Sequence, residues 1–170
     1  MATIEKAVAI AARAHAGVRD KHGAAYLLHP LRVMHAAGDA VAGLSGGDPR
    51  DAEPYQMVGV LHDVVEDTDV TLDDLRREGF AAAVIDALDL ITHRPGQPYA
   101  DYVIACGGNV IARQVKLADL ADNAGLRRAM MRPERIESDG RRLQKYVLSY
   151  RFLSGGLAEQ AYREAVSELG

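Results

Sequence analysis

A histidine–aspartate pair followed by two acidic residues is the part of this chain best suited to chemistry. His62 and Asp63 are followed by Glu66 and Asp67, all within the run Leu61–Thr68. If the run is helical, Glu66 lies one turn above His62, and Asp67 lies one turn above Asp63. Ionisable groups on a half-buried helix reduce stability unless a partner compensates their charge, and a metal ion is a common partner. The run therefore predicts one part of a metal site.

A metal needs further ligands, and two other segments offer them. His29 precedes Pro30 at the expected start of a helix, and Asp119 ends an apolar run. With His62 and Asp63 they give two imidazoles and two carboxylates, a mixed set that suits manganese, iron or zinc. A lone histidine before proline more often packs or caps a helix than binds a metal, so the prediction depends on the ordered set.

The elements that must position these residues are predicted to be helices throughout. Apolar residues recur at helical spacing, and no segment shows the sustained alternation typical of a strand. The chemical run is expected on one continuous helix, 52–66, and Pro30 in the first turn of a helix over 30–44. Residue 29, which precedes this proline, is expected to have an extended backbone. The other expected helices cover 3–16, 72–78, 81–92, 99–106, 109–123, 134–153 and 157–168, with loops at 17–29, 43–49 and 95–98.

Length and composition limit the class of protein. The 170 residues predict one domain, 1–170, with a single core. One cysteine permits no intrachain disulfide and no zinc–thiolate cluster, which fits a reducing cytosol. No apolar run approaches the roughly 20 residues that span a membrane, so a soluble cytoplasmic protein is expected. The net charge of −4 argues against nucleic-acid binding but allows a small phosphorylated substrate. The oligomeric state is left open.

Taken in order, these motifs resemble the HD-domain metal-dependent phosphohydrolases. The nearest branch is the hydrolase domain of the RelA/SpoT-type alarmone enzymes and their small single-domain relatives. The combination of His-Asp with a following Glu-Asp-Thr is specific to this branch. The matching pieces span about residues 10 to 125 and are His15-Ala16-Gly17, Lys21-His22-Gly23, Tyr26-Leu27-Leu28-His29-Pro30, Leu61–Thr68, and Val115-Lys116-Leu117-Ala118-Asp119 with Asn123.

The resemblance implies an all-α HD-domain helical bundle and a role for each matching residue. The implied reaction removes the 3′-pyrophosphate of guanosine tetra- or pentaphosphate, giving GDP or GTP and pyrophosphate. Arg19 or Lys21 is expected to face the substrate's phosphates. The implied roles are metal ligation, usually of manganese, by His29, His62, Asp63 and Asp119; positioning or activation of water by Glu66 and Asp67; and nucleotide binding by Lys21 and, near the ribose and base, Asn123.

Some residues depart from the family pattern and keep alternatives open. Asp20 places a negative charge where many members have a basic residue, and the run Leu120–Leu126 also differs. Another nucleotide, such as an adenosine alarmone or NADPH, is therefore the second hypothesis, and a non-catalytic nucleotide-binding module is the third. Asp122 is equally well explained as a partner of a metal ligand or as a solvated carboxylate. The basic run Arg127, Arg128, Arg132, Arg135, Arg141 and Arg142 could be a solvated face or could contact phosphates.

Overall fold

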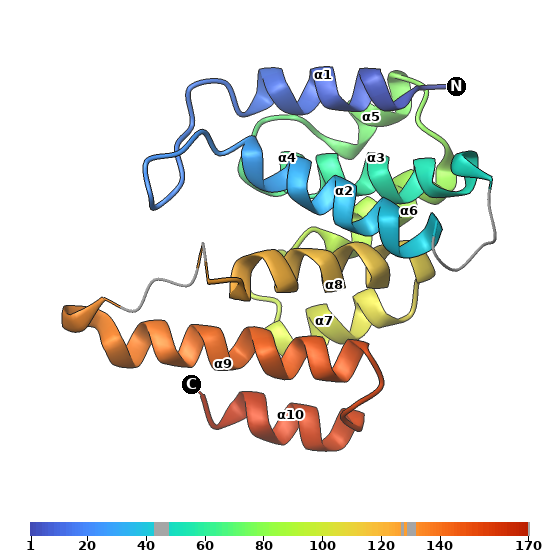
Figure 1. Ribbon diagram of the computed structural model, residues 1–170. Helices are drawn as coiled ribbons and strands as arrows, with labels where there is room; N and C mark the ends of the chain where they lie inside the picture. The colour runs from blue at the N-terminus through green and yellow to red at the C-terminus, as the bar shows by residue number, and fades with distance from the viewer. Residues whose placement is uncertain (43–47, 127, 129–131, 170) are drawn as a thin grey trace.

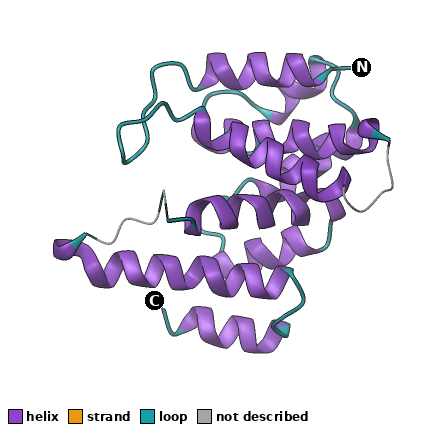
Figure 2. Cartoon of the chain, in the orientation of Figure 1, coloured by secondary structure: helices purple, strands orange, loops and turns teal. Residues whose placement is uncertain are grey.

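Helices make up the regular structure of the chain. The computed structural model describes residues 1–42, 48–126, 128 and 132–169, and within these ranges it contains no β-strand, only one isolated bridge between Arg19 and Ala25. Figure 2 shows helices joined by loops. The expectation of an all-α fold is confirmed. No helix in the described part of the chain combines the length and apolar character needed to cross a bilayer.

The helices form two stacked groups that meet at α8 (Figure 1). Helix α8 contacts α2, α3, α6, α7 and α9, and α1 packs on α3. The bounds are α1 (Ile4–Ala14), α2 (Leu28–Ala42), a 3-10 helix (Pro49–Ala52), α3 (Glu53–Leu61), α4 (Val64–Asp67), α5 (Leu72–Arg77), α6 (Ala82–Ile91), α7 (Tyr99–Gly107), α8 (Val110–Ala124), a 3-10 helix (Pro133–Arg135), α9 (Ile136–Leu153) and α10 (Glu159–Ser167).

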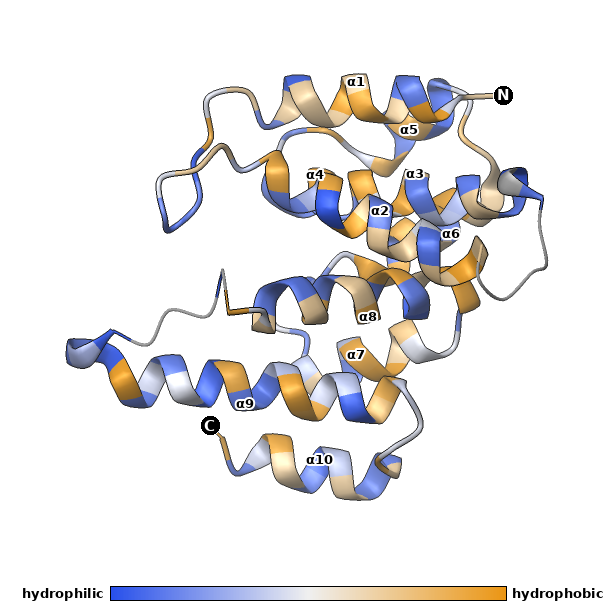
Figure 3. Cartoon of the chain, in the orientation of Figure 1, coloured by the Kyte–Doolittle hydropathy of each residue, from blue (hydrophilic) through white to orange (hydrophobic). Residues whose placement is uncertain are grey.

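Local capping explains where several helices begin. The Thr3 side chain accepts the Lys6 N–H at the start of α1, and Thr71 forms a capping box with Asp74 at the start of α5. The Asn109 side chain accepts the first free N–H groups of α8. The apolar faces of these helices meet in one core, which shows as orange stripes on their facing sides in Figure 3. The Asn109 cap fixes the start of α8, which carries part of the candidate site.

The backbones of α2 and α3 are in close contact at Gly59. A Cβ atom on this residue would lie 2.8 Å from the Cα of Met34, and the neighbouring Val33 and Val58 are fully buried. This contact brings the beginning of α2 next to the end of α3, so that the rings of His29 and His62 lie 5.2 Å apart between centroids. The absence of a side chain at residue 59 is therefore a condition for the candidate site.

The predicted continuous helix over 52–66 is wrong. Helix α3 ends at Leu61, and His62 and Asp63 lie in a break before α4. The ring of His62 donates from Nδ1 to the Gly59 carbonyl, at 2.8 Å, which is the acceptor that a continuing helix would use for the Asp63 N–H. The break separates the two chemical pairs onto different elements, so they do not form the stack on one helix that their spacing predicts.

The extended backbone predicted for His29 is also wrong. Helix α2 starts at Leu28, so His29 is helical and Pro30 is the third residue of the helix. The proline is tolerated there because the first turn needs no N–H from this position. The His29 N–H donates to the carbonyl of Tyr26, at 2.9 Å, which extends the turn of chain into the helix. The expected loop at 43–49 falls mostly outside the described residues, as does Arg127.

The contact at Gly59 predicts a stability effect. Gly59→Ala is expected to lower the free energy of unfolding by about 1–3 kcal/mol, because two backbones must separate to accept the methyl group. Gly140→Ala is the matched control, since a Cβ there meets nothing within 4 Å and the residue lies inside α9. That control should stabilise the protein by about 0.5–1 kcal/mol. Urea denaturation measures both, and equal effects of the two substitutions would refute the packing argument.

Candidate metal centre

The four residues expected to bind a metal lie together where α2, α8 and the break after α3 meet. His29 Nε2 is 3.2 Å from Asp119 Oδ1 and 3.6 Å from Asp63 Oδ2. His62 Nε2 is 3.1 Å from Asp63 Oδ1 and 3.7 Å from Asp119 Oδ1. One ligand atom each of His29, His62 and Asp119 lies within 4.8 Å of the others, and all three residues are buried. The arrangement places two nitrogens and two carboxylates around one small space.

The orientation of His62 fits a bound cation. Its Nδ1 is used by the Gly59 carbonyl, and its buried Nε2 has no hydrogen-bond partner among the described residues, although two carboxylates are near. Burial lowers the pKa of His62, but Asp63 and then Asp119 outweigh burial and raise the pKa well above its ordinary value. The carboxylates thus favour a positive charge at Nε2. A proton and a divalent metal would compete for that atom, and this donor set suits manganese, iron or zinc.

Asp122 holds the other imidazole in place. His29 Nδ1 lies 2.7 Å from Asp122 Oδ2, and the same carboxylate accepts a bond from Arg32 Nε at 2.6 Å. Burial raises the pKa of Asp122, but the hydrogen bonds from His29 and Arg32 outweigh it and lower the pKa. An ionised Asp122 keeps the proton of His29 on Nδ1, which leaves Nε2 free to act as a ligand. Asp122 is therefore paired with a candidate metal ligand, His29, and is not simply a solvated carboxylate.

Lys116 compensates Asp119, the most buried carboxylate of this cluster. Its Nζ lies 2.7 Å from Asp119 Oδ2, while Asn123 Nδ2 donates to Asp119 Oδ1 at 2.6 Å. Burial lowers the pKa of Lys116, but Asp119 outweighs it and keeps the lysine charged. Sequence reasoning gave Lys116 no role of its own. In the sequence, Lys116 is a member of the matching piece Val115-Lys116-Leu117-Ala118-Asp119 and a lone charge in an apolar run.

Tyr26 joins the cluster to the acidic pair. Its hydroxyl lies 2.6 Å from Asp63 Oδ2 and 3.2 Å from Asp67 Oδ2. Glu66 is held separately, because its Oε2 accepts the backbone N–H of His93 at 2.9 Å. Burial is the main cause that raises the pKa of both Glu66 and Asp67, and the charge of Asp63 adds to it. Tyr26 was expected only as part of a motif, and its bridging role depends on the fold.

A cavity of about 250 Å³ contains the residues expected to bind nucleotide. Two basic residues from the loop after α1 lie beside two from the C-terminal half of the chain. Asp20 also lines the cavity, but its Oδ1 accepts the N–H groups of His22 and Ala24 and so shapes the turn. Its negative charge is thus partly satisfied by the backbone. Besides Asp20, the polar or aromatic residues that line the cavity are Arg19, Lys21, His22, Tyr26, Asn123, Arg128, Arg142 and Tyr146.

The basic run divides into different environments. Arg132 and Arg142 both pair with the buried Asp139, at 2.7 and 3.0 Å. Arg128 lies 3.4 Å from Asp122 and 3.8 Å from Asp20. Arg135 and Arg141 belong to exposed parts of the 3-10 helix and α9. The run is therefore neither one solvated face nor one phosphate clamp.

Relatives in sequence are larger enzymes. The chain is 30% identical over 153 residues to a GTP pyrophosphokinase of Streptomyces coelicolor, covering 85% of this chain and 17% of the relative. It is 31% identical over 134 residues to a GTP pyrophosphokinase of Myxococcus xanthus, covering 71% of this chain and 16% of that protein. The chain thus spans less than a fifth of these curated relatives. No family model matches it.

A solved structure has a fold similar to that of this chain. It is a metazoan ortholog of SpoT, described as hydrolysing ppGpp, and it superposes with a TM-score of 0.65 over 99% of this chain and 94% of its own at 22% identity. The chain resembles the RelA/SpoT enzymes in both sequence and fold. In this RelA/SpoT-like chain the shared fold extends through α9 and α10, beyond the motifs that end near residue 125.

Asp122 offers a test of how the metal centre is supported. Asp122→Ala is expected to weaken manganese binding by about 10–100-fold, because His29 loses the carboxylate that orients it. Isothermal titration with MnCl₂ measures the affinity. Asp86→Asn is the control, because this carboxylate is exposed on α6. Unchanged affinity in a folded Asp122→Ala protein would show that the His29–Asp122 contact does not support a metal site.

Proposed function

We propose that this chain is a metal-dependent phosphohydrolase that removes the 3′-pyrophosphate from guanosine tetra- or pentaphosphate. The observation that carries the proposal is the buried cluster of His29, His62 and Asp119, with the half-buried Asp63 in contact with both histidines, beside a cation-lined cavity. A small nucleotide in the cytoplasm is the proposed substrate, and no nucleic acid or membrane takes part. The similarity to a protein described as hydrolysing ppGpp supports this choice.

The four clustered residues would hold the metal, for which we propose manganese. When bound, such an ion lowers the pKa of a coordinated water and offsets negative charge on a phosphoryl oxygen. The neighbouring Lys116, Asn123 and Asp122 would keep the ligands in place through the contacts described above. These supporting residues distinguish the cluster from an accidental meeting of polar side chains.

Glu66 and Asp67 are proposed to handle the water. Burial raises the pKa values of both carboxylates, which makes each of them a better proton acceptor in its ionised form. The water oxygen forms a bond to the phosphorus attached to the ribose 3′ oxygen, and the bond from phosphorus to that oxygen breaks. One water proton goes to the acidic pair and is passed on to the 3′ oxygen, which leaves as a hydroxyl, while the other stays with the released pyrophosphate. Tyr26 fixes Asp67 relative to Asp63 during this transfer.

The cavity is proposed to bind the nucleotide. Arg19 and Lys21 face it from the loop after α1, and Arg142 and Tyr146 face it from α9. The cations would pair with phosphate oxygens, while Tyr146 and Tyr26 provide aromatic surface for a base or ribose. Asn123 would contact the ribose and base with its amide oxygen or with the second N–H of Nδ2, because one N–H of Nδ2 already donates to Asp119.

Hydrolysis is proposed in preference to synthesis. The relatives named as pyrophosphokinases are several times longer than this chain, which matches 17% of them. The matching part contains the His/Asp cluster and the acidic pair, which suit the attack of water. We therefore do not propose for this chain the synthetic reaction that the name pyrophosphokinase describes.

The proposed reaction is tested directly with manganese-loaded protein. We expect release of pyrophosphate and GDP from guanosine tetraphosphate, with kcat reduced about 100-fold or more in Asp67→Asn and Glu66→Gln, because proton transfer contributes rate of this order. Anion-exchange chromatography identifies the products, and Asp86→Asn is the control. Metal analysis of each variant separates lost catalysis from lost metal. Intact guanosine tetraphosphate after long incubation with metal-loaded wild type would refute the proposal.

The nucleotide preference is tested with Lys21→Ser. Because this lysine lines the cavity without ligating the metal, its removal should raise KM about tenfold and change kcat little. Steady-state kinetics on a panel of guanosine tetraphosphate, an adenosine alarmone and NADPH measures the effect. Faster turnover of either of the last two would favour the second hypothesis. Tight binding of a nucleotide without any turnover would favour a binding module.

A further inference from the structure

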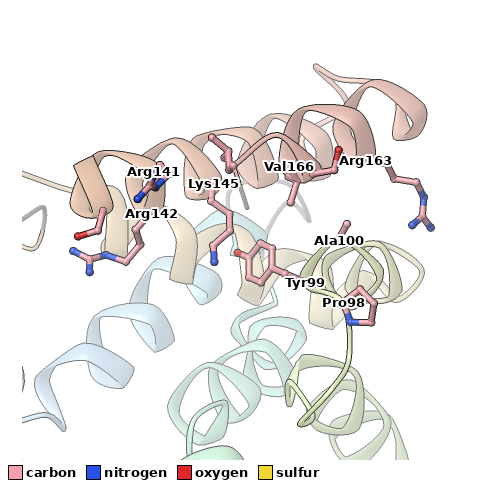
Figure 4. Close-up of a pocket in the computed structure, with 11 residues that line it drawn as sticks. Pro98, Tyr99, Ala100, Arg141, Arg142, Lys145, Arg163 and Val166 are labelled. Carbon is pink, nitrogen blue, oxygen red and sulfur yellow. The ribbon is translucent and has the colours of Figure 1, made fainter. Parts of the chain in front are cut away.

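A second cavity, of about 540 Å³, lies between the start of α7 and the helices α9 and α10. Figure 4 shows Tyr99 and Pro98 on one side and the basic side chains of α9 and α10 on the other. Apart from Arg142, it shares no lining residue with the cavity beside the metal centre. It uses a different face of α9, and nothing in the proposed reaction assigns it a role.

The lining of this cavity is strongly positive. Among the described residues, the lining includes Arg141, Arg142, Lys145 and Arg163 but no Asp or Glu, although the chain as a whole carries a net charge of −4. Two of the cations are already paired: Arg142 with Asp139, and Arg163 with Asp101 and Glu159, which stand outside the lining. In the described part of the chain, no carboxylate forms an ion pair with Arg141 or Lys145. Two positive charges are thus available to a ligand.

Tyr99 adds an unsatisfied polar group. Its hydroxyl oxygen is buried and has no hydrogen-bond partner in the described residues, and Lys145 Nζ lies 4.3 Å from the centre of its ring. Figure 4 shows the hydroxyl turned toward the amine end of Lys145. Burial lowers the pKa of Lys145, and the like charges of Lys116 and Arg142 lower it further. An anion beside Lys145 would offset the repulsion between these positive charges. It would also accept a hydrogen bond from the Tyr99 hydroxyl.

The remaining wall is partly apolar. Val166, Leu169 and Pro98 line it, and the volume lies within the range of about 300–1,000 Å³ that small-molecule pockets occupy. We propose that this cavity is a second ligand site, which binds a phosphorylated small molecule of nucleotide size. Its phosphates lie against Arg141 and Lys145, and its apolar part lies against α10. The proposal does not depend on the reaction at the metal centre.

The test counts the binding sites for GDP on the full chain. Isothermal titration with the manganese-loaded wild type is expected to give two binding events. The double variant Arg141→Ser/Lys145→Gln should weaken one event about tenfold or more, because two charge-assisted contacts are lost, and should retain the other. Lys21→Ser should weaken the binding event that the double variant retains, because Lys21 lines the cavity beside the metal centre. The control is Arg50→Ser/Arg151→Gln, which removes the same charge from residues that line neither cavity.

The outcome separates this proposal from the proposed function. Because the measurement is stoichiometry and affinity, a chain that hydrolyses nothing can still bind GDP at the second site. Binding by Arg141→Ser/Lys145→Gln equal to that of the control, in a protein with wild-type melting temperature, would overturn the proposal. If the double variant unfolds, each single substitution is titrated in its place. Loss of affinity in both singles supports the site, and loss in neither overturns it.

Discussion

Two carboxylates, Asp63 and Asp119, share a small and largely buried space, and the surrounding structure supplies the charge that this requires. Ionised groups in such a place are costly unless they are paired. Lys116 approaches Asp119 from within α8, two imidazoles approach from α2 and from the end of α3, and the Tyr26 hydroxyl comes from the loop before α2. A divalent cation in the same space would complete this compensation, because four of these groups are metal ligands by type.

The packing of the helices places the histidines beside the two carboxylates. The contact at Gly59 brings two histidine-bearing helix ends together, and it does so with backbone atoms that cannot shift as a side chain can. The break after Leu61 then turns His62 and Asp63 inward while leaving Glu66 and Asp67 on a short separate helix. The residues proposed to bind the metal and the carboxylates proposed to handle water thereby occupy adjoining but distinct positions, which is an arrangement suited to the proposed hydrolysis.

Helix α9 provides basic residues to both cavities. Its Arg142 and Tyr146 face the cavity beside the metal centre, and its Arg141 and Lys145 face the cavity against α7 and α10. The buried Asp139 anchors two arginines at the beginning of this helix. A chain with a net charge of −4 thus has clusters of basic residues around both cavities, which suits the phosphorylated ligands proposed for them.

The sequence by itself determined the all-α class, the positions of most helices and the identity of the clustered residues His29, His62, Asp63 and Asp119. Periodicity and capping act over a few residues, so they can be seen in the chain, and residue types limit which side chains can bind a metal. The tertiary structure decided the break at His62, the roles of Lys116 and Tyr26, the pairing of His29 with Asp122 and the second cavity. These depend on contacts such as that between His29 and Asp122, which are 93 residues apart, and local patterns carry no information on which distant faces meet.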